Sequence, residues 1–309
     1  MKSIAVLTGP TAVGKTFYSL GLAKALDGEI VSCDSMQLYR FMDIGSAKPS
    51  KEEMVQVKHH LIDAVDPRDS FSAAKYQGMA KKAIEDILDR GKFPIVTGGT
   101  GLYLNSLLYD MDFGPVPTDE EFRQSLFMLL EEKGKEALYE RLLRADPAAA
   151  QRIHPNNVKR VIRALEAIEK GEEPLRDFNR VVKKTEDYQV ILMGLNRPRS
   201  QLYQRINRRV DILMEKGLAQ EVKSLLSMGL TEEHISMKGI GYKELIDYYL
   251  GRSGLDEAVE RIKKNTRHYA KRQLTWFKRY EEMKWFHLDQ YNGEEEALED
   301  IVQWVKAKR

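Results

Sequence analysis

The sequence contains a single cysteine, Cys33, among 309 residues, which excludes an intramolecular disulfide framework and a zinc site built from several cysteines. No run approaches the roughly 18 to 20 consecutive apolar residues that a membrane-spanning helix requires. The first apolar run, Ile4 to Leu7, is too short for the apolar core of a signal peptide. We therefore expect a soluble protein of a reducing compartment, the cytoplasm.

Neither sign of charge dominates the sequence. The 49 Lys and Arg residues offset 47 Asp and Glu residues, so the formal net charge of +2 identifies no partner. A content of 42% hydrophobic and 31% charged residues is ordinary for a globular protein and excludes a largely disordered chain. At roughly 150 residues per domain, the length predicts two domains or one large domain with an insertion.

Short apolar runs that lead into glycine-rich turns characterise the first third of the chain. Ile4 to Leu7 precedes one such turn and Phe93 to Thr97 another, and a helical pattern follows each. Continuous apolar runs suit strands buried on both faces of a parallel sheet, and repeated strand–turn–helix units predict helices flanking that sheet. We expect strands at 4–7, 29–33, 93–97, 189–195 and 285–288, and helices at 15–26, 72–90, 200–217, 218–228 and 255–280.

The middle of the chain has a different character. Residues 113–187 contain no strand-like runs and are rich in charged, amphipathic segments such as 120–132. The run from Gln189 to Leu195 then restores the buried-strand pattern, so the sheet resumes after this segment. The sequence predicts an α/β core formed by 1–112 and 188–309, with a helical insertion domain at 113–187.

One motif indicates a phosphate site. Residues 9–16 read GPTAVGKT and match G-x-x-x-x-G-K-[ST], with a strand before the motif and a helix after it. Its glycines let backbone N–H groups point at phosphate oxygens, and the helix adds its positive end. We expect Lys15 to place a charge on the terminal phosphate, the Thr16 hydroxyl to ligate Mg²⁺, and the core to be P-loop NTPase-like. The predicted phosphate contacts are Gly9, Thr11, Ala12, Val13, Gly14, Lys15 and Thr16.

The motif leaves open whether the phosphate group is transferred, hydrolysed or expelled as a leaving group. A nucleotide-hydrolysing motor would carry an Asp after a later strand to hold Mg²⁺, but 93–97 leads into glycines and 189–195 into Asn196. Asp34 instead follows the strand next to the P-loop unit, at the sheet edge where α/β proteins bind ligands. Asp34 is our candidate for a general base or for a carboxylate near the metal ion. The alternative is an Asp that caps a helix or stabilises a turn.

Two weaker signals accompany these residues. A second glycine-rich turn, 98–101, could bring N–H groups and the Thr100 hydroxyl to the same edge. His59 and His60 could suggest a metal-binding pair. Adjacent residues do not share a face of a helix or strand, which favours structural or substrate-contacting histidines.

Positive charge gathers in two segments despite the neutral total. Residues 195–280 contain 18 Lys and Arg against 10 Asp and Glu, and 261–279 contain eight basic residues and no acid. A second acid-free patch covers 152–163. A charge run is often only a solvated surface, but two such patches beside a phosphate site favour binding of nucleic acid. The candidate contacts are Lys264, Arg267 and Lys271 in the first patch and Lys159, Arg160 and Arg163 in the second.

Eight motifs spread over nearly the whole chain resemble the tRNA dimethylallyltransferases, in the order found in that family. They are GPTAVGKT (9–16), DSMQLY (34–39), DIGSAKP (43–49), HHLID (59–63), GGTGLY (98–103), IHPNNVKRVIRALE (153–166), GIGYKEL (239–245) and AKRQLTWF (270–277). Two departures are Val13, where Ser is usual in the family, and Ser46, where Thr is usual. The first removes a hydroxyl that could contact phosphate.

The resemblance implies transfer of a dimethylallyl group from its pyrophosphate to N6 of the adenosine immediately 3′ of a tRNA anticodon, with release of pyrophosphate. The expected partners are the tRNA anticodon stem-loop and dimethylallyl pyrophosphate, with Mg²⁺ and without a membrane or a protein partner. The adenosine would be flipped out of the stacked loop to reach the pyrophosphate. The resemblance also implies residue roles. Asp34 would be the base for the N6 proton, and the segment Asp34, Ser35, Met36 and Gln37 would surround the adenine. Thr100 and Arg123 would contact flanking RNA, and Arg209 would bind the pyrophosphate, with Arg205 and Arg208 as alternatives.

Three other functions remain open from the residues. A related enzyme that prenylates free AMP, ADP or ATP would need the P-loop and Asp34 but little basic surface. A P-loop kinase acting on a small metabolite would consume ATP and give a phosphorylated product. A non-catalytic RNA-binding module is disfavoured, because it would not need Lys15, Thr16 and Asp34 together.

Overall fold

The computed structural model describes residues 2–111, 119–171 and 183–309, which form two compact units. The first unit comprises Met1–Tyr109 and Thr185–Arg309, and the second comprises Asp110–Lys184. The second unit is helical, whereas the first contains the sheet. The predicted architecture, an α/β core interrupted by a helical insertion, is confirmed. The insertion predicted from sequence, 113–187, begins and ends three residues later than the compact unit.

A six-stranded, all-parallel sheet forms the centre of the first unit, in the order β3-β2-β4-β1-β5-β6. Its strands are β1 (Ser3–Thr8), β2 (Gly28–Cys33), β3 (His59–His60), β4 (Phe93–Gly98), β5 (Gln189–Asn196) and β6 (Lys284–His287). Four expected strands are found within one residue of their predicted ends, and 285–288 is found as β6. The sequence did not predict β3, since two residues are too few to show a pattern.

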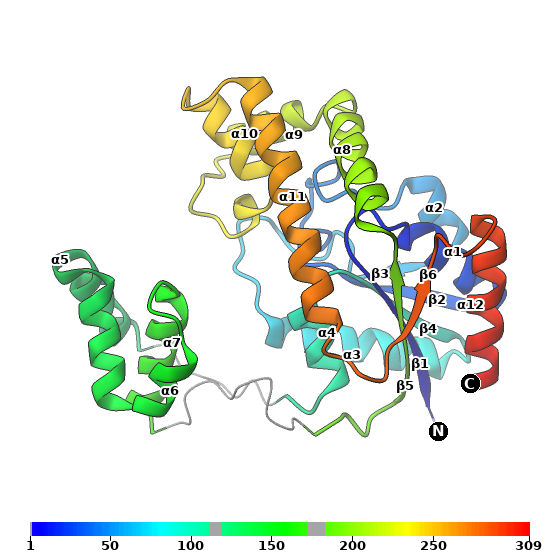
Figure 1. The fold of residues 1–309 in the computed structure, drawn as a ribbon, viewed down its shortest axis with the longest axis horizontal. Helices are drawn as coiled ribbons and strands as arrows, with labels where there is room; N and C mark the ends of the chain where they lie inside the picture. The colour runs from blue at the N-terminus through cyan, green and yellow to red at the C-terminus, as the bar shows by residue number, and fades with distance from the viewer. Residues whose placement is uncertain (1, 112–118, 172–182) are drawn as a thin grey trace. The chain divides into compact units, whose positions relative to one another are not determined.

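Helices cover both faces of this sheet (Figure 1). The helices of the first unit are α1 (Lys15–Ala25), α2 (Lys51–Gln56), α3 (Ala73–Asp89), α4 (Gly101–Leu108), α8 (Arg199–Glu215), α9 (Leu218–Ser227), α10 (Tyr242–Tyr249), α11 (Leu255–Phe277) and α12 (Glu294–Lys308), with a 3₁₀ turn at Ser236–Lys238. In the described part of the chain, no helix is both long and apolar enough to cross a membrane.

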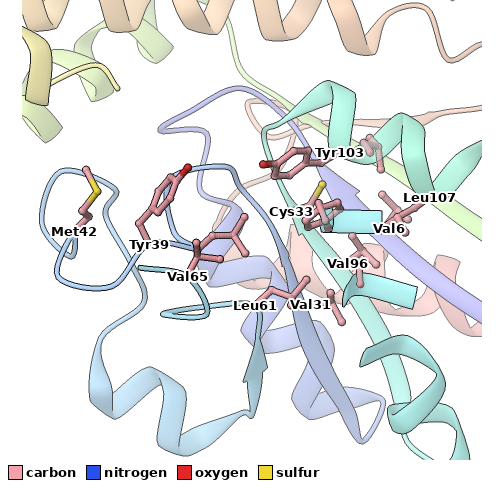
Figure 2. Packing of buried hydrophobic residues seen from close by; sticks show 14 of the residues in the cluster. Val6, Val31, Cys33, Tyr39, Met42, Leu61, Val65, Val96, Tyr103 and Leu107 are labelled. Atoms are coloured by element: carbon pink, nitrogen blue, oxygen red, sulfur yellow. The ribbon is translucent and has the colours of Figure 1, made fainter. Parts of the chain in front are cut away.

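Two buried clusters explain this arrangement. Figure 2 shows the first, in which Val6, Val31 and Val96 from three neighbouring strands pack with Leu107 of α4. Alternate residues of the same strands, such as Leu7, point to the other face and pack against α1 and α12. Because both faces are buried, the strands appear in the sequence as continuous apolar runs rather than as alternating ones.

Local signals fix several helix ends. The Ser72 hydroxyl accepts the backbone N–H of Lys75 at 3.2 Å and caps α3. At the other end, Gly91 has a φ of 72°, a left-handed conformation that glycine adopts without steric cost. Helix α2 begins with a reciprocal pair in which Ser50 accepts from the Glu53 N–H and the Glu53 carboxylate accepts from the Ser50 N–H.

The second unit is built from α5 (Glu120–Ala145), α6 (Pro147–Arg152) and α7 (Val158–Glu169). Helix α5 contains a break at Gly134, where φ is 78°. Its core joins Leu126 and Leu138 of α5 to Ile162 of α7, so the unit has an apolar core of its own. The amphipathic segment 120–132, noted in the sequence, forms the first part of α5.

The strand order determines where the functional loops meet. Strand β1 lies between β4 and β5. After β1 the chain continues to β2, on the β4 side of β1, whereas after β4 it continues to β5, on the other side of β1. Ligands of α/β proteins bind at such a switch point, at the carboxyl ends of the strands. At this edge β2 and β4 are so close that a Cβ on Gly98 would lie 2.1 Å from the Cys33 carbonyl oxygen. Only glycine fits there.

Candidate active site

The P-loop after β1 adopts the conformation that its glycines permit. Gly9 has a φ of 149°, and a Cβ there would lie 2.6 Å from the carbonyl oxygen of Leu195 on β5. Gly14, immediately before α1, has a φ of 116°. The Val13 side chain is fully buried, so it packs in the core and leaves only backbone atoms to a phosphate. Ala12 and Thr11 complete the loop, and the exposed Thr16 is the second residue of the helix.

Lys15 bends back over this loop. Its Nζ donates to the carbonyl oxygens of Gly9 at 2.9 Å and Pro10 at 3.0 Å. Burial lowers the pKa of Lys15 to about 8; the Asp34 carboxylate opposes that shift and the Arg209 guanidinium adds to it. A buried ammonium group whose pKa is lowered would gain from a bound anion, because the anion favours its charged form.

Arginines from the segment after β5 surround the same loop. Arg205 of α8 donates from Nε to the Ala12 carbonyl at 2.9 Å, and Arg197 donates from Nε to the Val13 carbonyl at 3.2 Å. Arg208 is exposed, whereas Arg209 is half-buried. Burial lowers the pKa of Arg209, opposed by Asp34. Arg205, Arg208 and Arg209 all line one cavity with Lys15, and Arg209 also interacts electrostatically with Lys15 and Asp34.

Asp34 follows β2 and lines this cavity. Its Oδ1 accepts the backbone N–H of Met36 at 2.9 Å, a contact typical of an Asp that stabilises a turn. The next residue, Ser35, donates its N–H to the Thr100 hydroxyl at 3.0 Å, and the two side-chain hydroxyls lie 3.3 Å apart. The second glycine-rich turn therefore holds the Asp34 segment in place.

Gln37 is held at both ends of its amide. Its Oε1 accepts from the Ser32 hydroxyl at 2.9 Å, and its Nε2 donates to the Ala47 carbonyl at 3.4 Å. Met36 and Gln37 both line the cavity, together with Ser35. The predicted adenine-contacting segment thus forms one wall of the same space that the P-loop borders.

Gln273 of α11 is a site residue whose role the sequence did not indicate. Its Oε1 accepts the Thr11 N–H of the P-loop at 2.8 Å, and its Nε2 donates to the Gly99 carbonyl at 2.9 Å. The side chain is buried and also lines the cavity. It joins the two glycine-rich turns to the basic helix. Tyr269, one turn earlier, donates its hydroxyl to the same Gly99 carbonyl at 3.4 Å.

We expect replacement of Gln273 by Met to loosen both turns. Methionine fills a similar volume but leaves the Thr11 N–H and the buried Gly99 carbonyl without this partner, at a cost of about 1–3 kcal/mol in the free energy of unfolding. Denaturant titration measures that loss, and steady-state kinetics should show a higher KM for the phosphate-bearing substrate. Gln273→Glu is the matched variant, because it keeps the acceptor for Thr11 and loses only the donor to Gly99. Wild-type stability and KM in Gln273→Met would contradict this role.

The cavity that these groups line has a volume of about 1610 Å³. Besides the P-loop and the Asp34 segment, Lys238 and Lys243 line it near α10, and Arg272 lines it from α11. These three cations were not among the residues predicted from the sequence. Lys243 lies in the GIGYKEL motif and Arg272 in the AKRQLTWF motif, which carried the resemblance, whereas Lys238 directly precedes the first of them.

The basic helix α11 is less free than its charge suggests. Lys264 and Lys271 are exposed, as expected, but Arg267 is half-buried and donates to the Asn207 side chain at 2.6 Å. Arg261 and Lys263 form ion pairs with acids on other elements. Of the eight basic residues counted in 261–279, six lie in α11, and ion pairs or hydrogen bonds already engage three of these six.

In the helical unit the predicted RNA contacts also differ in exposure. Lys159 and Arg163 on α7 are exposed, and Arg160 is half-buried. Arg123 on α5 forms a hydrogen-bonded ion pair with the buried Glu166, its Nε lying 2.6 Å from Oε1. The hydrogen bond to Glu166 raises the pKa of Arg123 against the opposing effect of burial. This pair stabilises the unit itself.

The histidine pair has a structural environment. His60 Nε2 lies 2.6 Å from Oε2 of the buried Glu29, and His59 Nδ1 lies 2.8 Å from the Val57 carbonyl oxygen. Arg90 also binds Glu29, and this contact is the main reason that the pKa of Glu29 falls to about 2. Among the described residues, no group of three or more His, Cys, Asp and Glu side chains could hold a metal ion. A cation at the P-loop would rest mainly on the Thr16 hydroxyl and ligand oxygens.

Known proteins resemble this chain over nearly its whole length. The family model described as IPP transferase matches residues 37–280. A tRNA dimethylallyltransferase of Alkaliphilus oremlandii is 50% identical over 305 residues, covering 99% of this chain and 97% of that protein. The crystal structure of the tRNA isopentenylpyrophosphate transferase of Bacillus halodurans has a TM-score of 0.75 and 43% identity, covering 100% of this chain and 97% of that one.

A eukaryotic dimethylallyltransferase whose structures are described as acting on tRNA also matches. Its TM-score is 0.75 at 31% identity, covering 90% of this chain and 70% of that one. The resemblance inferred from the eight sequence motifs is therefore confirmed by whole-chain similarity and by fold. The chain belongs to the IPP transferase family.

Proposed function

We propose that this protein transfers a dimethylallyl group from dimethylallyl pyrophosphate to N6 of the adenosine immediately 3′ of the anticodon in tRNA. A C–N bond forms between N6 and the allylic carbon, the C–O bond to pyrophosphate breaks, and the N6 proton leaves to a base. The observation that carries the proposal is the meeting of Lys15, Arg209 and Asp34 at one cavity. The two cations can stabilise negative charge on the leaving pyrophosphate, and the carboxylate can accept the N6 proton.

The P-loop would bind the pyrophosphate. Its backbone N–H groups and the start of α1 favour an anion, and Lys15 and Arg209 add full charges beside them. Charge grows on the pyrophosphate as the C–O bond breaks, so these groups would bind the transition state more strongly than the ground state. In this role the P-loop expels pyrophosphate and does not transfer a phosphoryl group.

Mg²⁺ fits this site as a cation shared with the substrate. It commonly takes one or two protein oxygens, with the remaining ligands supplied by phosphates and water. The exposed Thr16 hydroxyl at the start of α1 is such an oxygen. Bound there, the ion would neutralise charge on the departing pyrophosphate.

The acceptor adenosine would enter from the wall formed by Asp34, Met36 and Gln37. A base stacked in an anticodon loop cannot reach the P-loop, so the nucleotide would be flipped into the cavity. The volume of about 1610 Å³ can hold a nucleoside together with a prenyl pyrophosphate. Asp34 then accepts the N6 proton with the carboxylate oxygen that does not bind the Met36 N–H. Such a tRNA substrate would place the reaction in the cytoplasm.

Basic surfaces on both units would bind the tRNA backbone. Lys264 and Lys271 are exposed on α11, the helix that also carries Gln273 to the P-loop. In the helical unit, Lys159 and Arg163 provide a second exposed patch. Bases in loops are what proteins read in RNA, while phosphate contacts supply most of the affinity. We assign placement of the anticodon loop to the helical unit.

One assay tests this function. The purified protein is incubated with Mg²⁺, dimethylallyl pyrophosphate and either unmodified tRNA or AMP, and the nucleosides are then analysed by mass spectrometry. We expect a dimethylallyl adduct on the tRNA adenosine, with one pyrophosphate released per transfer and without consumption of ATP or GTP. Modification of AMP alone would identify the nucleotide-prenylating alternative. Coupled ATP hydrolysis would overturn the proposed role of the P-loop.

Removal of the two exposed lysines of α11 should weaken the salt dependence of tRNA binding. Each single-strand phosphate contact contributes about −0.7 to the slope of log K against log salt, so Lys264→Ala with Lys271→Ala should flatten it by up to about 1.4. Adding Arg267→Ala should change the slope little, because that side chain binds Asn207. Filter binding at several salt concentrations measures the slopes.

The matched control removes the same charge from α12. Lys306 and Lys308 are exposed. The Lys308 carbonyl accepts from the Gln189 side chain at the amino end of β5, whereas the P-loop follows the carboxyl end of β1. Their replacement by Ala should leave the slope unchanged. An equal effect of the two double variants would show that α11 is only a solvated surface and that the tRNA is bound elsewhere.

A further inference from the structure

Beyond the groups already placed at the reaction, the loop after β2 has an unusual anchor in Glu221. The loop spans residues 41–48, and its Gly45, Ser46 and Ala47 line the cavity beside Gln37. The Glu221 carboxylate of α9 accepts the backbone N–H groups of three consecutive loop residues. The distances are 2.8 Å from Asp43, 2.7 Å from Ile44 and 3.0 Å from Gly45.

A fourth hydrogen bond completes this anchor. The Tyr242 hydroxyl of α10 donates to Oε1 of Glu221 at 2.8 Å, and Tyr242 is fully buried. Its ring packs so closely on Gly45 that a Cβ there would lie 2.6 Å from the ring and hydroxyl. Three successive N–H groups around one anion form a binding nest, here occupied by a side chain of the same protein.

The loop needs such an anchor because its backbone is strained. Phe41 and Ala47 have φ values of 67° and 47°, left-handed conformations that non-glycine residues adopt only when their surroundings enforce them. Figure 2 shows Tyr39 and Met42 on this segment, which leaves the sheet after β2. The nearly buried Lys48 side chain fixes the other end of the loop by binding Asp43 at 2.6 Å.

The loop also connects to the reacting groups. The Ala47 carbonyl accepts from Nε2 of Gln37, and Gln37 follows Asp34 by three residues. The position of Ala47 therefore influences how the Gln37 amide is oriented in the wall of the cavity. Neither Glu221 nor Tyr242 touches the P-loop in any described contact, so the pyrophosphate end is held independently.

We propose that Glu221 is a positioning residue, which fixes the cavity wall that receives the acceptor adenosine by binding the N–H groups of residues 43–45. This inference rests on the proposed function. It assigns no proton transfer to Glu221. The carboxylate acts through the loop, because its oxygen atoms are already engaged by backbone amides and by Tyr242.

Two variants separate charge from shape. Glu221→Gln keeps the size but turns an NH₂ group toward backbone donors, whereas Glu221→Asp keeps the anion on a shorter side chain. We expect Glu221→Gln to lower kcat for prenyl transfer by about 10- to 100-fold, since sub-ångström to 1 Å misplacement of a reacting group costs this much. Glu221→Asp should recover a large part of that loss. Tyr242→Phe removes one of the four hydrogen bonds and should cost only a few-fold.

The measurements are chosen to isolate positioning. Rates are taken at saturating tRNA and dimethylallyl pyrophosphate, normalised to the folded fraction by circular dichroism. The KM for dimethylallyl pyrophosphate and the Kd for tRNA should change little in Glu221→Gln, because the P-loop and the phosphate contacts lie elsewhere. Loss of stability alone would lower the melting temperature without lowering the normalised kcat.

The outcomes distinguish this inference from the proposed function. An inactive wild-type protein in the tRNA assay would overturn the proposed function itself. An active wild type with an unaffected Glu221→Gln variant would overturn the positioning role alone. A Glu221→Asp variant less active than Glu221→Gln would show that the shape of the side chain matters and not its charge, which also contradicts the proposal.

Discussion

Replacement of Asp34 by alanine is expected to lower kcat by about 10²- to 10⁴-fold, the range for loss of a general base. The carboxylate lines the cavity close enough to Lys15 and Arg209 to raise the pKa of each against the effect of burial. Affinity for tRNA should change little, because phosphate contacts supply most of it. Single-turnover rates and filter binding measure the two effects separately.

Asparagine at this position decides between the two interpretations of Asp34. The Asn side chain can still accept the Met36 N–H with its Oδ1, as Asp34 does at 2.9 Å, and so preserves the turn. It cannot take up the N6 proton. If Asp34 is the base, Asp34→Asn should be nearly as slow as Asp34→Ala. A near wild-type rate for Asp34→Asn, with a slow Asp34→Ala, would reduce the residue to a turn stabiliser.

The sequence predicted the sheet because its strands are buried on both faces. Runs such as Ile4–Leu7 and Phe93–Thr97 stand out from the polar helices around them, and glycines mark their ends. The P-loop was predictable for a related reason, since a phosphate cradle needs glycine at fixed positions. A helix was expected after the second glycine-rich turn, but its limits were not predicted: all but the first two residues of α4 are buried, so its sequence, GLYLNSLL, has no polar face that would mark its extent.

Contacts between distant parts of the chain were not predictable in this way. The sequence of α11 could not show that Gln273 binds Thr11, which lies 262 residues away. The same holds for Glu221, which lies 178 residues from Asp43. Charge counting overestimated the free cations of α11, because it could not show that Arg261 is paired with Asp247 on α10.

Replacement of Lys15 by methionine is expected to raise the KM for dimethylallyl pyrophosphate and to lower kcat by about 10²- to 10³-fold, the usual cost of removing one group that stabilises developing negative charge. Methionine retains the length of the side chain and removes its ammonium group. Lys15→Arg serves as the charged control and should lose less. A Lys15→Met variant that binds dimethylallyl pyrophosphate as tightly as wild type would place the pyrophosphate elsewhere in the cavity.

The pH dependence of substrate binding provides a second test of Lys15. Because its pKa is lowered to about 8, mainly by burial, the ammonium group loses its proton as the pH rises through that value. The pyrophosphate favours the charged form, so binding should take up a proton and the KM should rise between about pH 7 and 9.5. In Lys15→Met the KM should already be high and should vary less over the same range. Parallel pH profiles for the two proteins would show that another titrating group causes the pH dependence, which would contradict this role of Lys15.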